Sequence, residues 1–134
     1  MTGAGAKFKE NALRLQKLDP SYDNALGYTL EGCFYAVAPW PLKNFDKAMG
    51  LLKKAVDTAP GSRRNHYHLA VCSYLVGDFQ LAAKESRATL DSRPTGNDID
   101  FADFMAEEAE RVHALAMEKV LKEVDFSADK KKRG

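Results

Sequence analysis

The spacing of prolines is the feature that most constrains how this chain can fold. Pro20, Pro60 and Pro94 each follow a segment with helical spacing of apolar residues, and they stand 40 and 34 residues apart. A proline inside a helix removes a hydrogen bond and collides with the preceding turn, so a helix ends before each of these positions. Regular stops at intervals of this length indicate stacked helix-turn-helix units.

Apolar residues recur at helical spacing between these stops, and no segment alternates convincingly as a strand would. Asn44 is a candidate N-cap and Gly77 a candidate C-cap, while Asn97 or Asp98 is expected to cap the last helix. We therefore predict an all-α fold, a helical-hairpin array with a long C-terminal capping helix. The predicted helices span residues 7–18, about 24–37, 45–58, about 62–76, 79–92 and about 99–124.

Residues 65–86, "NHYHLAVCSYLVGDFQLAAKES", resemble one unit of the tetratricopeptide repeat (TPR) family, whose period is about 34 residues. Leu69-Ala70 match the leucine and small residue of the first helix, and Gly77-Asp78-Phe79 match the turn. An earlier unit and a leading half unit, "ALRLQKLDP", bring the total to about two and a half repeats. The residues that match in these units and at the end of the later one are Gly32, Tyr35, Phe45, Ala48, Ala55, Pro60, Ala82 and Pro94.

A narrower resemblance covers residues 31–82. This stretch is similar to the TPR partner proteins of TRAP-type transporters and to the regulator-of-microtubule-dynamics proteins. The similarity is carried by the Gly-x-x-Tyr-x-x-Ala-Pro run at 32–39, the tryptophan turn, and Arg64-Asn65-His66. We expect residues 1–6 to be a flexible N-terminus, 7–94 the repeats, 95–124 the capping helix and 125–134 a basic flexible tail.

The family resemblance implies a binding surface. In TPR proteins the first helices of successive units line a concave groove that receives peptides. Because its predicted lining here is apolar with aromatic rims, we expect it to suit an apolar helix or an extended hydrophobic segment. The long last helix folding back into the groove is an open alternative. The predicted lining residues are Thr29, Cys33, Ala36, Val37, Arg64, Tyr67, Val71, Tyr74 and Leu75.

Trp40 lies between two prolines, which restrict the backbone around it. One interpretation is a buried cap over a helix pair, since tryptophan is usually largely buried, and we favour it. The other is an anchor at a protein interface, where tryptophan is over-represented.

His66, His68 and Cys72 raise the question of a metal site. His66 and His68 point to opposite sides of a helix, so only His68 and Cys72 share a face, whereas structural zinc takes four ligands. The acids of residues 98–110 are better explained by a helix N-terminus and a solvated face than by acid–base catalysis. No nucleophile or phosphate-loop motif is present. We expect no catalytic activity, metal or cofactor.

The charge balance of 20 basic and 19 acidic residues gives no global attraction to nucleic acid. No apolar run approaches the length of a membrane span. Two cysteines in a chain of this size indicate buried thiols in a reducing compartment, the cytoplasm or an organelle interior. The basic run Lys130, Lys131, Lys132 and Arg133 could contact an acidic partner weakly, although a solvated terminus is favoured.

Together these patterns predict a non-catalytic protein–protein interaction module, an adaptor or an accessory subunit of a larger assembly. The unpartnered face of residues 7–18 is expected to pack on another chain. One alternative is a carrier of a small apolar ligand in the groove. Another is a mitochondrial-surface TPR adaptor, which would need a C-terminal membrane anchor.

Overall fold

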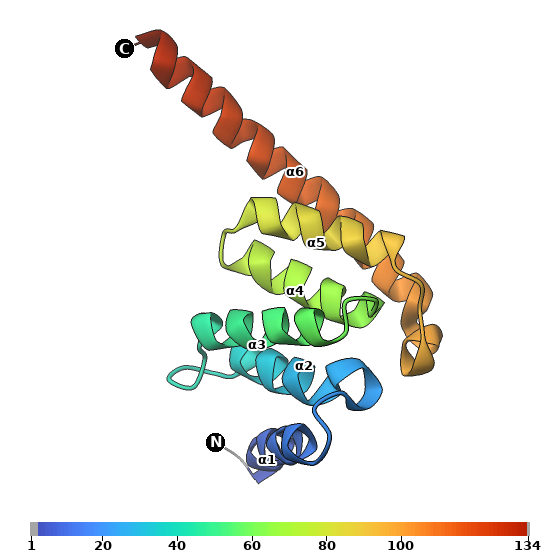
Figure 1. The fold of residues 1–134 in the computed structure, drawn as a ribbon. Coiled ribbons are helices and arrows are strands. Elements are labelled where there is room, and N and C mark those ends of the chain that lie inside the picture. The colour runs from blue at the N-terminus through green and yellow to red at the C-terminus, as the bar shows by residue number, and fades with distance from the viewer. Residues whose placement is uncertain (1–2, 134) are drawn as a thin grey trace.

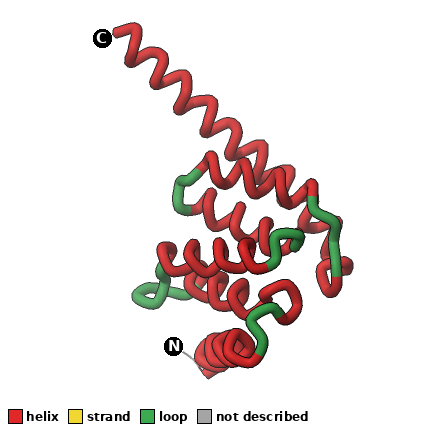
Figure 2. The backbone as a smooth tube through the Cα atoms, viewed as in Figure 1, coloured by secondary structure: helices red, strands yellow, loops and turns green. Residues whose placement is uncertain are grey.

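The chain forms an extended stack of helices in the computed structural model, which describes residues 3–133. Within that range every regular element is helical, as the sequence predicted, and no strand occurs (Figure 2). The helices are α1 (Gly3–Leu18), α2 (Tyr22–Val37), α3 (Phe45–Thr58), α4 (Arg63–Leu75), α5 (Phe79–Asp91), the 3-10 helix η1 (Gly96–Phe101) and α6 (Ala102–Arg133).

Consecutive helices pack side by side and form hairpins. Helix α2 pairs with α3 and α4 pairs with α5, while α1 packs on α2 and α6 packs along α5 (Figure 1). Contacts also join α2 to α4 and α4 to α6, so these three helices form one inner row of the stack. Helix α6 thus takes the place that the first helix of another unit would occupy. The predicted hairpin array with a long C-terminal helix is confirmed.

Local capping explains why several helices begin and end where they do. The side chains of Asn44, Ser62 and Asp78 each accept a bond from a backbone N–H in the first turn of α3, α4 and α5. Each cap satisfies a donor that would otherwise lack a partner in the helix. Gly77 adopts φ +85° after α4, a conformation that suits glycine. The predicted caps at Asn44 and Gly77 are therefore confirmed.

The α2–α3 hairpin is close because a glycine lies at the crossing. A Cβ atom added to Gly32 would stand 2.8 Å from Leu52 Cγ and 3.3 Å from the Ala48 carbonyl oxygen. This approach lets Leu52 pack into the main core, where it is fully buried. The other buried members of that core are Phe34, Tyr35, Ala38, Ala48, Leu69 and Cys72.

Both terminal helices are longer than the sequence predicted. Helix α1 begins at Gly3, since its early alanines favour helix, and α6 runs on from Val124 to Arg133. In α6 the exposed Lys122–Glu118 pair at 2.9 Å and the basic last turn both favour helix. Residues 1, 2 and 134 of the predicted flexible ends lie outside the described residues.

The start of α6 also differs from the prediction. Asp98 lies in η1 and does not cap α6, because its carboxylate faces the N-terminus of α4. There Oδ2 accepts from the Ser62 hydroxyl and the Arg64 backbone N–H, both at 3.5 Å, and Asp98 is 1% exposed. The positive end of the α4 dipole, together with the Arg64 side chain, explains why this acid is drawn to α4.

Candidate functional site

A hollow lies on the inner face between α2 and α4. It has a volume of about 90 Å³ and brings together five of the predicted groove residues. Two of them are widely open to solvent, since Val37 is 76% exposed and Leu75 is 58% exposed. The predicted residues that line it are Cys33, Ala36, Val37, Val71 and Leu75, and Leu52, His68 and Cys72 complete the wall.

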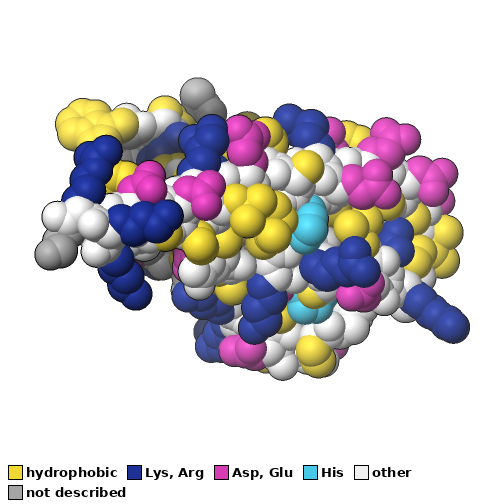
Figure 3. Space-filling view, turned by 90° about the horizontal axis from the view of Figure 1, so that it is seen from above, with side chains coloured by type: hydrophobic (Ala, Val, Ile, Leu, Met, Phe, Trp, Pro, Cys, Tyr) yellow, Lys and Arg dark blue, Asp and Glu magenta, His cyan; other side chains and the backbone are white. Residues whose placement is uncertain are grey.

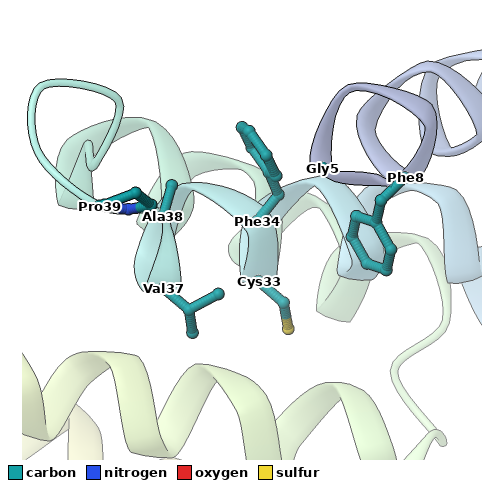
Figure 4. Close-up of a pocket in the computed structure, with 7 residues that line it drawn as sticks. All are labelled: Gly5, Phe8, Cys33, Phe34, Val37, Ala38 and Pro39. Carbon is teal, nitrogen blue, oxygen red and sulfur yellow. The ribbon is translucent and has the colours of Figure 1, made fainter. Parts of the chain in front are cut away.

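A larger groove continues from this hollow toward α1. It has a volume of about 780 Å³ and lies between α1 and the end of α2 (Figure 4). Cys33 and Val37 line both depressions, so the two form one apolar surface, called the inner groove below. The side chains of Cys33 and Val37 point to the same side of α2, with Phe8 of α1 nearby. The larger part is lined by Gly5, Phe8, Cys33, Phe34, Val37, Ala38 and Pro39.

The two predicted tyrosines are partly covered. The Tyr67 ring lies 6.4 Å from that of Phe104 on α6, and burial raises the pKa of its hydroxyl. The Tyr74 ring lies 5.4 Å from that of Phe79 and packs on a small cluster that includes Ala116 of α6. Helix α6 therefore covers part of the predicted surface on α4, while the hollow beside α2 remains.

Thr29 and Arg64 occupy a different place from the one predicted. Both are buried, Thr29 at 1% and Arg64 at 8% exposure, so neither offers a surface to a partner. The Thr29 hydroxyl donates to Asn65 Oδ1 at 2.8 Å and joins α2 to α4. These two residues hold the scaffold together instead of lining the groove.

Arg64 belongs to a buried polar network that fixes the start of α2. The first turn of α2 is left-handed, with φ of 46°, 56° and 63° at Asp23, Asn24 and Ala25. Arg64 Nη2 donates to the Asp23 carbonyl at 2.5 Å, and Asn65 Nδ2 donates to the Asn24 carbonyl at 2.7 Å. Such a turn is costly for residues with a Cβ, above all for Ala25, and it persists where its surroundings stabilise it.

Two acids complete this network. Arg64 Nη1 lies 3.4 Å from Asp23 Oδ2 and 3.4 Å from Asp98 Oδ1. A buried charge is tolerated when it is paired and hydrogen-bonded. The network therefore ties α2, α4 and η1 together and sets the orientation of α2, which carries Cys33 and Val37 to the groove.

Trp40 is 88% exposed, so it is not a buried cap over a helix pair. The loop between α2 and α3, which carries Trp40, projects from the stack of helices (Figure 2). Trp40 directly follows Pro39, which lines the inner groove. Of the two interpretations of the sequence, the interface anchor is the one compatible with this exposure.

Lysines from two helices converge on Tyr35 next to the groove. Lys9 Nζ lies 5.3 Å and Lys47 Nζ 4.6 Å from the centre of its ring. Burial raises the pKa of the Tyr35 hydroxyl, but hydrogen bonding and the charges of the two lysines outweigh it, so this pKa lies below its usual value. Lys9 also lies 5.9 Å from the ring centre of Phe34, a groove residue.

His66 is hydrogen-bonded within the scaffold, and His68 and Cys33 are neutral. His66 Nδ1 lies 2.5 Å from Glu85 and Nε2 lies 2.6 Å from the Pro60 carbonyl, and the bond to Glu85 raises the His66 pKa. Burial lowers the pKa of His68 to about 4 and raises that of Cys33 to about 11, so both are neutral at pH 7. Among residues 3–133, no three His, Cys, Asp or Glu side chains gather closely enough to hold a metal ion.

Positive and negative side chains are mixed on one face of the molecule. Lys, Arg, Asp and Glu side chains are interspersed on the face seen from above (Figure 3), in line with the net charge of +1. Lys130 to Arg133 are exposed in the last turn of α6. None of the helices described between residues 3 and 133 combines the length and apolar character needed to cross a membrane.

Several groove residues were not predicted. Phe8 and Phe34 are apolar residues of two separate helices, and their place in one groove depends on the angle between α1 and α2. Lys9 and Lys47 lie on α1 and α3, far apart in sequence, and no local pattern joins them.

Comparison with known proteins does not assign the chain to a family. No protein-family model matches the chain, and no curated protein shows significant similarity to it. The TPR resemblance therefore stays a prediction.

Proposed function

We propose that this chain is a non-catalytic protein–protein interaction module, an adaptor or accessory subunit, that binds an apolar helix or extended segment in the inner groove. The observation that carries the proposal is the continuity of the two apolar depressions through Cys33 and Val37. Contiguous apolar surface on a protein exterior is typical of interaction sites.

The exposed side chains around the groove would contribute part of the free energy of binding a partner. Phe8, Val37 and Leu75 are all substantially exposed and would be covered by a bound segment. Complete burial of such a side chain contributes about 1.5–3 kcal/mol. Three such anchors contribute about 4.5–9 kcal/mol at full burial, and because association itself costs at least about 4 kcal/mol, micromolar binding requires further contacts.

The scaffold beneath the groove supports a preformed site. Arg64 and Asn65 hold the start of α2 against α4 through several hydrogen bonds. Ordering a flexible surface would subtract from the binding energy, and this arrangement reduces that cost. Exposed Trp40, beside the end of the groove, is suited to act as a further anchor.

The test is a comparative pull-down from native extract with crosslinking and mass spectrometry. Wild type is compared with Val37→Lys/Leu75→Lys, and Phe126→Lys on α6, outside the groove, serves as control. Val37 and Phe126 have similar exposure, 76% and 73%, so neither change opens the core. We expect a stoichiometric partner that is retained by the control and lost with the groove variant. Equal recovery with all three proteins, or no partner with any, would contradict the proposal.

A small apolar ligand is the second candidate for the groove. Its volume of about 780 Å³ and its apolar walls favour this alternative, because ligand pockets commonly measure about 300–1,000 Å³. Mass spectrometry of the native protein and of an organic extract of it distinguishes the two. A defined apolar compound released from wild type but not from Val37→Lys would favour the carrier.

A further inference from the structure

The inner row of helices stops at α2, and the larger groove lies where the row would continue. Helices α2, α4 and α6 contact one another in order, and each is followed or preceded by an outer helix. Helix α1 packs on α2 as the outer helix of a unit whose inner helix is absent from residues 3–133. The larger groove lies between α1 and α2 and shares Cys33 and Val37 with the inner face. Its position is thus that of one more inner helix.

The groove has a basic side. Lys9 lies over Phe34, and Lys9 and Lys47 both approach Tyr35. The ion pairs within residues 3–133 involve neither lysine, so no carboxylate of the described chain lies within 4 Å of their ammonium groups. Tyr35 and, to a smaller extent, the Glu31 carboxylate raise the pKa of Lys47. Neighbouring cations that form no ion pair within the described residues favour an anionic partner.

We propose that the groove between α1 and α2 receives an amphipathic helix of a partner protein, with acidic residues beside its apolar stripe. The stripe fills the space lined by Phe8, Phe34 and Val37, and the acids meet Lys9 and Lys47. This assignment rests on the proposed function and specifies the partner's chemistry. Helix-in-groove binding of this kind places anchors at i, i+3, i+4 and i+7.

A second copy of this chain fits less well. Its projecting helix end, the last part of α6, carries Lys130 to Arg133 in the last turn. Placing these cations near Lys9 and Lys47 would bring like charges together, which disfavours the pairing.

The probe is a pair of synthetic helical peptides that share one apolar stripe and differ in their flanks, Asp/Glu in one and Lys/Arg in the other. The stripe is selected beforehand from a displayed library of helical peptides whose apolar and flanking positions are randomised. Selection is by binding to the full chain. Binding is measured by fluorescence anisotropy at low and at physiological salt. The proteins are wild type, Lys9→Glu/Lys47→Glu, and the control Lys53→Glu/Lys132→Glu, which changes net charge equally at exposed sites and also tests the basic tail.

We expect the acidic peptide to bind wild type and the control alike. Lys9→Glu/Lys47→Glu should weaken it by about tenfold or more and should improve binding of the basic peptide. Peptides that bind without preference for charge, or that ignore Lys9→Glu/Lys47→Glu, would overturn this inference and leave the proposed function standing. Failure of every peptide to bind would contradict the proposed function as well. Binding to vesicles of phosphatidylcholine and phosphatidylserine through the same lysines, without peptide binding, would assign the basic side to anionic lipid and overturn the helix.

Discussion

Replacing two glycines with alanine gives a quantitative test of helix packing. Gly32 lies inside α2 and Gly50 inside α3, so both substitutions gain helix propensity of about 1 kcal/mol. Their surroundings differ. A Cβ at Gly50 meets nothing within 4 Å, whereas one at Gly32 stands 2.8 and 2.9 Å from two atoms of Leu52.

The two effects oppose each other only at Gly32. Leu52 is 1% exposed and has little room to move, and inserting an extra carbon into a packed core costs about 1–3 kcal/mol. Gly50→Ala should therefore stabilise by about 0.5–1 kcal/mol, and Gly32→Ala should be neutral or destabilise by up to about 2 kcal/mol. The difference between the two variants isolates the packing cost, because the propensity gain is common to both.

Urea unfolding followed by circular dichroism measures both free energies of unfolding, and thermal melting provides a second reading at about 4 °C per kcal/mol. Equal stabilisation by both substitutions would show that α2 and α3 do not approach at Gly32. The hairpin geometry described here would then be refuted.

Two further predictions concern the buried charges and the histidines. Arg64→Leu leaves the buried Asp98 without its cation and should destabilise by about 3–5 kcal/mol in urea unfolding, whereas a loss below about 1 kcal/mol would show that the network contributes little. The fold favours the charged form of His66. The contribution of His66 to the free energy of unfolding is therefore full below its ordinary pKa of 6.5, and it is lost as the pH rises through its raised pKa in the folded protein. His68 acts in the opposite sense, because its pKa is lowered to about 4 in the folded protein. The contribution of neutral His68 to the free energy of unfolding is full above pH 6.5 and falls as the pH drops toward 4. Urea midpoints between pH 4 and 9 should show that His66→Gln removes the alkaline loss and His68→Gln removes the acid loss. Unchanged pH profiles in both variants would contradict these environments.

The helices were predictable where their signals are local. Helix α3 spans Phe45–Thr58 as predicted, because Asn44 caps its start and Pro60 follows its end. The 34-residue spacing of Pro60 and Pro94 also indicated the hairpins, since small residues such as Gly32 mark the points where helices cross. The caps and stops depend on neighbours within a few residues, and the hairpins on a spacing along the chain.

The start of α2 could not be predicted in this way. Its left-handed turn at Asp23, Asn24 and Ala25 is held by Arg64 and Asn65, which lie about 40 residues later. The same long-range network draws Asp98 away from the helix it was expected to cap. Groove residues Thr29 and Arg64 were placed by analogy with a repeat pattern, and this network explains why both are buried instead.

The inner groove was partly predictable. Cys33, Val37, Val71 and Leu75 follow from helical periodicity and the repeat, and the structure brings them together. The larger part depends on how α1 lies across α2, which is a tertiary feature. Trp40 shows the limit of a residue-type argument, because tryptophan is usually buried but here lies at 88% exposure between two prolines.

Site-specific photocrosslinking tests whether a partner docks in the inner groove. A photoreactive amino acid is introduced at Val37 in the groove or at Phe126 on α6 outside it, two positions of similar exposure. After irradiation in native extract, mass spectrometry identifies the crosslinked peptides. We expect one recurrent apolar segment of a partner protein crosslinked from position 37 and not from position 126. Equal, scattered crosslinks from both positions, or none from position 37, would contradict it.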